Sequence, residues 1–138
     1  MQISVVDQSP IFTNSDANQA LQDTIKLAEF SDSIGLNRFW LAEHHGSSSF
    51  AGCSPEILIP RIASSTERIR VGSGGVMLMH YSPYKVAENF RLLESLFPKR
   101  IDLRPYTVNG MAGVDINGVV DSSSGGGGGN GSGSSSSS

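Results

Sequence analysis

Two adjacent histidines, His44 and His45, are the side chains of this sequence best suited to transfer a proton near neutral pH. They follow the β-rich run 39–42, and side chains alternate from face to face along a strand. His44 is therefore expected on one face, and His45 on the other together with Glu43. Because the histidines diverge and no third ligand lies at zinc-like spacing, the pattern argues against a metal site. A proton-transfer histidine and a structural, hydrogen-bonded histidine both fit it.

A glycine pair, Gly74-Gly75, lies inside the next β-rich segment. Glycine within a strand often marks the close approach of a ligand to the backbone, so a flat ring could lie against the main chain here. A kinked or bulged strand explains the same residues. The spacing of the glycines matches neither the dinucleotide-binding motif nor the P-loop, which argues against a phosphate cradle.

A third polar group follows the first β-rich segment, where Asp7, Gln8 and Ser9 offer an acid, an amide and a hydroxyl. Such residues can bind a ligand, or they can form a turn with a capping side chain. The lone cysteine, Cys53, has no base that can be assigned as its partner, which favours an inert thiol.

The elements that must position these residues alternate between strand and helix. Glycine, proline and capping residues mark the ends of these strands and helices, and apolar residues recur within each element at strand or helix spacing. Strands are predicted at Ile3–Val6, Arg38–Ala42, Ile69–Leu78 and Ile101–Leu103, and helices at about Asp16–Ser33, from Ser54-Pro55-Glu56 onward, and from Ser82-Pro83 to Pro98. Such alternation indicates an α/β fold of about four parallel β-α units. The spacing of the elements alone does not distinguish half of an eight-stranded barrel from a small open sheet.

Composition narrows the function classes. The 138 residues carry a net charge of −3 and no basic stripe, which argues against nucleic acid as a partner. No apolar run approaches the roughly 20 residues of a membrane helix, and the first residues do not resemble a signal peptide. One cysteine excludes an internal disulfide and fits a reducing compartment. We therefore expect a soluble, cytoplasmic protein without membrane contacts.

The chain is predicted to divide into three parts. Residues 1–103 form the folded α/β region, and 104–120 form an irregular segment in which Arg104-Pro105-Tyr106 ends the fourth strand and Asn117-Gly118 could turn a hairpin. Residues 121–138 contain nine serines, seven glycines, one asparagine and one aspartate. Such a tail cannot bury enough surface to offset its ordering entropy, so we expect it to be disordered.

Taken together, six motifs over residues 1–103 resemble the bacterial luciferase-like flavin-dependent monooxygenases, in that family's order and from its N-terminal half only. The motifs are Asp7-Gln8-Ser9-Pro10, the run 39–45, the run 68–78, His80-Tyr81-Ser82-Pro83 with Lys85-Val86-Ala87-Glu88, Leu96-Phe97-Pro98, and Arg100-Ile101-Asp102-Leu103. The resemblance implies a (β/α)8 TIM barrel that binds reduced FMN at the C-terminal face of its strands, where O2 oxygenates a small organic substrate.

The same resemblance assigns roles to individual residues. It implies that His44 is catalytic and handles protons beside the flavin. It implies that Gly74 and Gly75, with a non-proline cis bond between them, lie against the flavin ring, and that Asp7, Gln8 and Ser9 belong to the cofactor site.

The sequence departs from the family's pattern at Met79, where proline is usual, and at Thr107, where an arginine that holds the flavin phosphate is expected. A closed barrel takes about 250 residues, so we expect this chain to be a truncated half that binds flavin weakly or not at all and is weakly active or inactive. Its open edges at the first and fourth strands predict a homodimer or a self-associating, non-catalytic half-barrel. A deazaflavin-dependent oxidoreductase is a further alternative.

Overall fold

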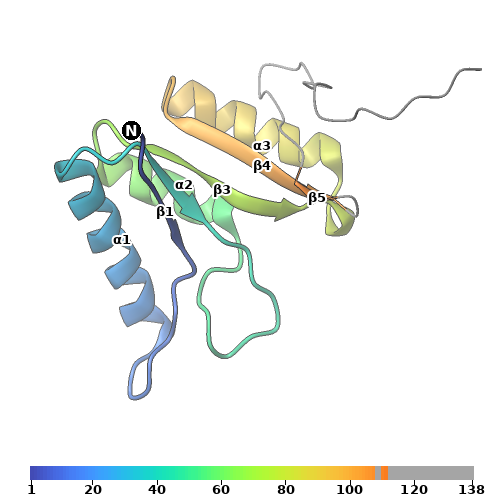
Figure 1. Ribbon diagram of the computed structural model, residues 1–138. Helices are drawn as coiled ribbons and strands as arrows, with labels where there is room; N and C mark the ends of the chain where they lie inside the picture. The colour runs from blue at the N-terminus through green and yellow to red at the C-terminus, as the bar shows by residue number, and fades with distance from the viewer. Residues whose placement is uncertain (108–109, 112–138) are drawn as a thin grey trace, which may run out of the picture.

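One sheet of five strands organises the protein (Figure 1). The computed structural model describes residues 1–107 and 110–111. The first four strands are parallel, their order in the sheet is their order along the chain, and the short fifth strand runs antiparallel to the fourth. The strands are β1 (Ser4–Asp7), β2 (Arg38–Leu41), β3 (Arg70–Met77), β4 (Ile101–Thr107) and β5 (Gly110–Met111). The predicted parallel β-α units are confirmed.

Three α-helices connect the parallel strands and cover one face of the sheet (Figure 1). They are α1 (Ala17–Ser33), α2 (Pro55–Ser65) and α3 (Pro83–Leu96), and a short 3-10 helix, η1 (Leu78–His80), precedes α3. The Asp16 side chain caps α1 by accepting a hydrogen bond from the Gln19 N–H at 2.8 Å. Proline opens both α2 and α3, where its missing N–H costs nothing. The predicted helix starts are therefore confirmed.

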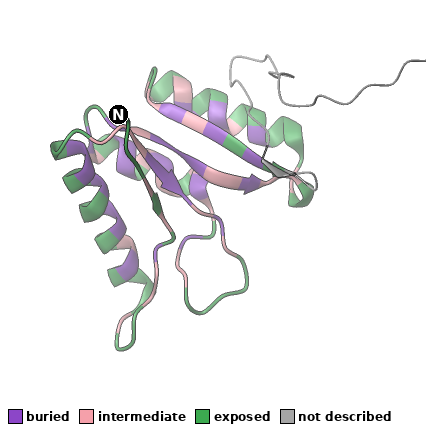
Figure 2. Ribbon diagram, in the orientation of Figure 1, coloured by how far each residue is buried: buried purple, intermediate pink, exposed green. Residues whose placement is uncertain are grey.

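The hydrophobic core lies between the sheet and the three helices (Figure 2). Alternate strand residues point into it and meet the buried stripe of each helix. Its members include Phe39 and Leu41 of β2, Val71 of β3, Ile101 and Leu103 of β4, Ile25 of α1, Ile59 and Ile62 of α2, and Phe90 of α3. The helices therefore pack against one face of the sheet only. Among the described residues no helix covers the other face, which we call the open face.

The open face is built around the single tryptophan of the chain. The Trp40 ring lies against Gly72 of β3, where an added Cβ would stand 2.9 Å from the ring and 2.5 Å from the Asp102 carbonyl oxygen. The Arg104 guanidinium covers the ring at 4.5 Å from its centroid, a cation–π contact. Trp40 is thereby buried although no helix covers it.

Two arginines at the start of the strands share one carboxylate on the open face. Asp102 accepts hydrogen bonds from the Arg38 Nε at 3.1 Å and from the Arg70 Nη2 at 2.7 Å.

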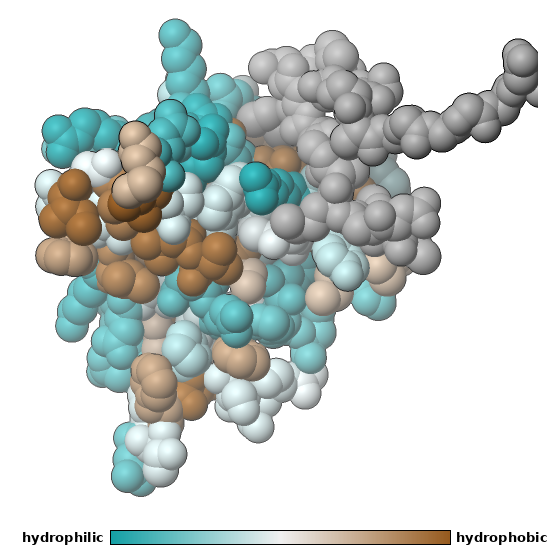
Figure 3. Space-filling model, viewed as in Figure 1, coloured by the Kyte–Doolittle hydropathy of each residue, from teal (hydrophilic) through white to brown (hydrophobic). Residues whose placement is uncertain are grey.

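Beyond this cluster, apolar side chains are exposed over β1 and the neighbouring part of α1 (Figure 3). Val6 of β1 is 62% exposed.

The fourth strand differs from its prediction. β4 does not end at Leu103 but continues through Pro105 to Thr107. A bulge in β3 makes this continuation feasible, because three steps from Ser73 to Val76 face two steps from Leu103 to Pro105. The Ser73 hydroxyl accepts the Arg104 N–H at 3.2 Å and so fills the gap in the ladder. Proline, which has no N–H to donate, is tolerated at such an irregularity.

The edge at β4 is also less open than predicted, because Tyr106 and Thr107 pair with β5. The predicted hairpin at Asn117-Gly118 and the predicted disordered tail at 121–138 lie outside the described residues. Within residues 1–107 and 110–111, no helix has the length and apolar character needed to cross a bilayer.

Candidate functional site

The loops after β1 and β2 are joined by backbone hydrogen bonds at the carboxyl edge of the sheet. The Ala42 N–H donates to the Asp7 carbonyl at 3.0 Å, and the Ala51 N–H donates to the Ser9 carbonyl at 2.9 Å. The His44 N–H donates to the Gly52 carbonyl at 2.9 Å. Because parallel strands end at one edge, the predicted site residues of these loops lie on one rim.

The Asp7 carboxylate makes its contacts within the chain. Its Oδ2 accepts the Ser9 N–H at 3.0 Å, the Ser9 hydroxyl at 3.2 Å and the Thr24 hydroxyl of α1 at 2.6 Å. Ser9 is buried and has a φ of 50°. The structure thus brings Asp7 and Ser9 together in a turn that anchors α1, whereas Gln8 between them is exposed. This is the capping turn that the sequence offered as one of two interpretations.

His44 presents a polar atom without a partner. Its ring stacks on Phe50, with the centroids 4.5 Å apart and the planes 25° apart. Among the described residues, its buried Nε2 has no hydrogen-bond partner. A buried polar atom left unsatisfied costs free energy, so such an atom is commonly one that a ligand or water completes.

The glycine pair lies in the β3 bulge, which confirms the bulged-strand interpretation. A Cβ on Gly74 would stand 3.3 Å from the Leu41 carbonyl oxygen and 3.4 Å from the Trp40 Cβ, so the backbone passes close to β2 there. The cis bond implied between Gly74 and Gly75 is wrong for this structure, because the described residues contain no cis peptide bond. Gly75 instead takes a φ of 158° at the bulge.

A cluster of three polar side chains joins the loops after β2 and β3. Glu43 is 5% exposed, and its Oε1 accepts hydrogen bonds from the His45 Nε2 at 2.6 Å and from the Tyr81 hydroxyl at 2.5 Å. Its Oε2 accepts the Met77 N–H at 2.9 Å. The hydrogen bond to Glu43, with burial, raises the pKa of Tyr81 from 10.0 to about 12.

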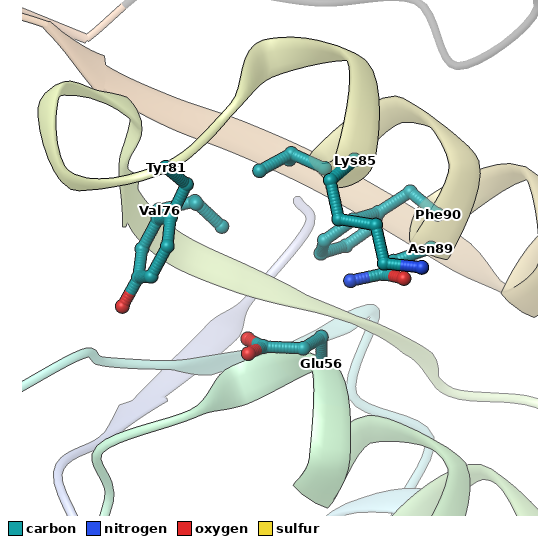
Figure 4. Close-up of a pocket in the computed structure, with 7 residues that line it drawn as sticks. Glu56, Val76, Tyr81, Lys85, Asn89 and Phe90 are labelled. Atoms are coloured by element: carbon teal, nitrogen blue, oxygen red, sulfur yellow. The ribbon is translucent and has the colours of Figure 1, made fainter.

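Strand alternation predicts Glu43 and His45 on one face, whereas Tyr81 belongs to the motif His80-Tyr81-Ser82-Pro83 but receives no individual role from the sequence. The Tyr81 phenol also borders a small pocket of about 50 Å³ between α2 and α3. Figure 4 shows Tyr81 on one side of this pocket, Lys85 and Asn89 of α3 on the other, and Glu56 between them at the lower edge. In the described part of the chain, no three metal-ligating side chains gather.

Comparison with known proteins identifies the family that residues 1–104 match. The family model for luciferase-like monooxygenases matches residues 1–104. The N-acetyl-S-alkylcysteine monooxygenase of Bacillus subtilis is 52% identical over 103 residues, which are 75% of this chain and 31% of that protein. The chain spans about 30% of the length of the curated relatives it matches.

Solved structures agree with this match. The structure of apo-MsnO8 has a TM-score of 0.76 and 51% identity, over 78% of this chain and 32% of the other. The oxygenating constituent of 3,6-diketocamphane monooxygenase from Pseudomonas putida, a type II Baeyer-Villiger monooxygenase in complex with FMN, has a TM-score of 0.69 and 25% identity, over 75% and 28%. The parallel strands, the shared rim and the match over residues 1–104 lead to one conclusion: this chain belongs to the luciferase-like monooxygenase family.

Proposed function

We propose that this chain supplies the flavin-ring side of a luciferase-like flavin-dependent monooxygenase, in which reduced FMN and O2 oxygenate a small organic substrate. The observation that carries the proposal is the buried Nε2 of His44, which has no hydrogen-bond partner among residues 1–107 and 110–111 and lies on a rim formed by the ends of parallel strands. A flavin ring edge carries the nitrogen and oxygen atoms that such an imidazole could bond. The Pseudomonas putida relative, which is in complex with FMN, supports the choice of cofactor.

The described residues fit the ring end of FMN better than its phosphate end. His44 would bond the ring edge through its Nε2 and hold a proton there, and Gly74 and Gly75 would lie against the ring. The turn of Asp7, Gln8 and Ser9 would border the cofactor through its backbone, because the polar atoms of Asp7 and Ser9 already bond each other and Thr24. At position 107, where the family resemblance places a phosphate-binding arginine, the chain has threonine.

Titration with FMN, followed by flavin fluorescence, tests this proposal. We expect saturable binding that is weaker than micromolar, because charge-assisted phosphate contacts are missing. His44→Ala should weaken binding by up to about tenfold, since one hydrogen bond contributes about 0.5–1.5 kcal/mol. The exposed His80 provides the matched control, and His80→Ala should leave binding unchanged.

Absence of saturable binding, or equal losses in the two histidine variants, would contradict the assignment of His44. Micromolar or tighter binding would contradict the weakness expected at the phosphate end. The same titration with a deazaflavin tests the alternative cofactor. Incubation with reduced FMN, O2 and N-acetyl-S-alkylcysteine, with the oxygenated product measured directly, tests whether the chain oxygenates the substrate class of its Bacillus relative.

A second candidate is a non-catalytic, self-associating half-barrel. One specific observation favours it: among the described residues, β1 pairs only with β2, so its outer edge offers unpaired backbone groups. Val6 on this strand is also 62% exposed. A homodimer formed along β1 would satisfy these groups. The two candidates are separable, because self-association requires no flavin.

A further inference from the structure

One buried carboxylate connects the two loops that border the proposed flavin site. The Glu43 side chain is 1% exposed, and both of its oxygens accept hydrogen bonds. Of the three donors, His45 belongs to the loop after β2, whereas the Met77 N–H ends β3 and Tyr81 follows η1. Burial of a carboxylate is costly unless donors surround it, and here three donors do so.

The position of Met77 gives this contact a geometric consequence. Met77 lies two residues after the Gly74–Gly75 bulge, and Glu43 directly precedes His44 in the chain. The hydrogen bond from the Met77 N–H to Glu43 therefore fixes the bulged end of β3 relative to the segment that carries His44. Without it, this segment would be joined to the end of β3 only indirectly, through the Tyr81 hydroxyl beyond η1 and through the β2–β3 ladder, which ends at Leu41 and Ser73.

The same contacts determine which nitrogen of His45 carries the proton. An ionised carboxylate can only accept hydrogen bonds, so both the Tyr81 hydroxyl and the His45 Nε2 must donate to Glu43. The 3.2 Å contact between Nε2 and the Tyr81 oxygen is then a close approach of two donors. It follows that neutral His45 carries its proton on Nε2 and keeps Nδ1 as the acceptor.

We propose that Glu43 is a positioning residue: it holds the ends of the loops after β2 and β3 together and fixes His45 as the Nε2-protonated tautomer with Nδ1 free to accept a proton. The inference rests on the proposed function only in that these loops border the flavin. A carboxylate behind an imidazole is a common device for orienting a histidine in proton transfer.

The titration of Tyr81 supports the same arrangement. Its pKa of about 12 comes first from the hydrogen bond to Glu43 and then from burial, with smaller contributions from the charges of Glu43, Glu56 and Cys53. Lys85 of α3 lines the pocket beside the phenol, and the His80 ring lies 6.4 Å from the Tyr81 ring. Tyr81 is one of three tyrosines, so its ionisation can be followed by tyrosinate absorbance.

The first experiment replaces one acid at a time. In Glu43→Gln, the amide cannot accept all three donors, and the pKa of Tyr81 should fall from about 12 toward the ordinary value of 10.0. Glu56→Gln is the matched control, because Glu56 acts on the phenol only through its charge, and its effect should be the smaller one. Tyr81→Phe identifies which absorbance step belongs to this residue. An unchanged Tyr81 titration in Glu43→Gln would overturn the proposal.

The second experiment uses the unaltered chain and therefore stands even if the variant fails to fold. Nitrogen NMR of the histidine rings should show His45 protonated on Nε2, and hydrogen exchange should show the Met77 amide protected. A proton on Nδ1, or rapid exchange of that amide, would overturn the proposal. No flavin enters either experiment, so failure of this inference and failure of the proposed function give different results.

Discussion

At the scale of single residues, the glycines of β3 serve the packing of Trp40 as much as any ligand. A side chain at Gly72 would meet the Asp102 backbone at 2.5 Å and the Trp40 ring at 2.9 Å, so only glycine lets the indole lie flat on the strand. At Gly74 the nearest atoms would be 3.3 Å away, which is tight but not a collision. Gly72 and Gly74, two residues apart on the same face, therefore differ in how much space they leave for a side chain.

Gly72→Ala should lower the free energy of unfolding by about 1–3 kcal/mol, the usual cost of overpacking a well-filled site. Urea denaturation followed by Trp40 emission measures the loss. Gly74→Ala is the matched variant and should cost less, because its neighbours need to give only a few tenths of an ångström. An equal or larger loss at Gly74 would show that the fit around Trp40 is not what Gly72 provides.

At the scale of elements, Asp32 joins the end of α1 to the start of β3. Its carboxylate accepts the N–H groups of Glu67, Arg68 and Ile69 at 2.8, 3.0 and 2.7 Å. Burial acts to raise the pKa of Asp32, but the three hydrogen bonds together with the positive charge of Arg68 outweigh it, and the net effect lowers the pKa below its usual value. The ionised form therefore stabilises the fold.

Asp32→Asn should lower the free energy of unfolding by about 1–3 kcal/mol near neutral pH, since an amide oxygen cannot replace a carboxylate toward three donors. Because the folded pKa is depressed, this stabilisation is present above the unfolded value of about 3.9 and is lost as pH falls through the folded value. The difference between the two proteins should therefore shrink below about pH 4. Denaturation at several pH values measures it. Asp23→Asn, an exposed change on the same helix, should cost little at any pH.

Local signals in the sequence predicted the elements well because the determinants are local. Asp16 and the prolines at 55 and 83 act within one helical turn, and Gly35 takes the left-handed φ of 81° expected after α1. The predicted end of β4 at Leu103 is wrong, because it rests on Pro105 as a strand breaker. A bulge on the neighbouring strand β3 accommodates this proline.

In the candidate site, too, the sequence predicts what depends on neighbouring residues and not what depends on long-range packing. Strand alternation separated His44 from the pair of Glu43 and His45, because alternation is a property of neighbouring residues. The Tyr81 hydroxyl reaches Glu43 across 38 residues, and the packing of η1 against β4 helps to bring it there. The catalytic role of His44 stays a prediction.

At the scale of the whole molecule, the part of the chain that the structure describes forms a sheet with a covered face, an open face and an unpaired edge at β1. An unpaired strand edge with an exposed valine favours pairing with another strand. Analytical ultracentrifugation should therefore show concentration-dependent association at micromolar concentrations. Val6→Lys should reduce the association, since a charge on an edge strand opposes pairing.

The control for this prediction is Ile57→Lys, which puts the same charge at a 72% exposed position of α2, away from the edge. It should leave association unchanged. A monomer at all concentrations, or equal effects of the two lysines, would count against pairing through β1.

The arginines of the open face decide how two copies could meet. In the described part of this face, β2, β3 and β4 each carry one arginine, namely Arg38, Arg70 and Arg104, and β4 also carries Asp102. Three positive charges and one negative charge leave these four residues with a net charge of +2. Identical faces would therefore repel each other, and a covering segment that carries acidic groups would be favoured over a basic one. Charge complementarity thus favours contact between like copies along their edges over contact between their open faces.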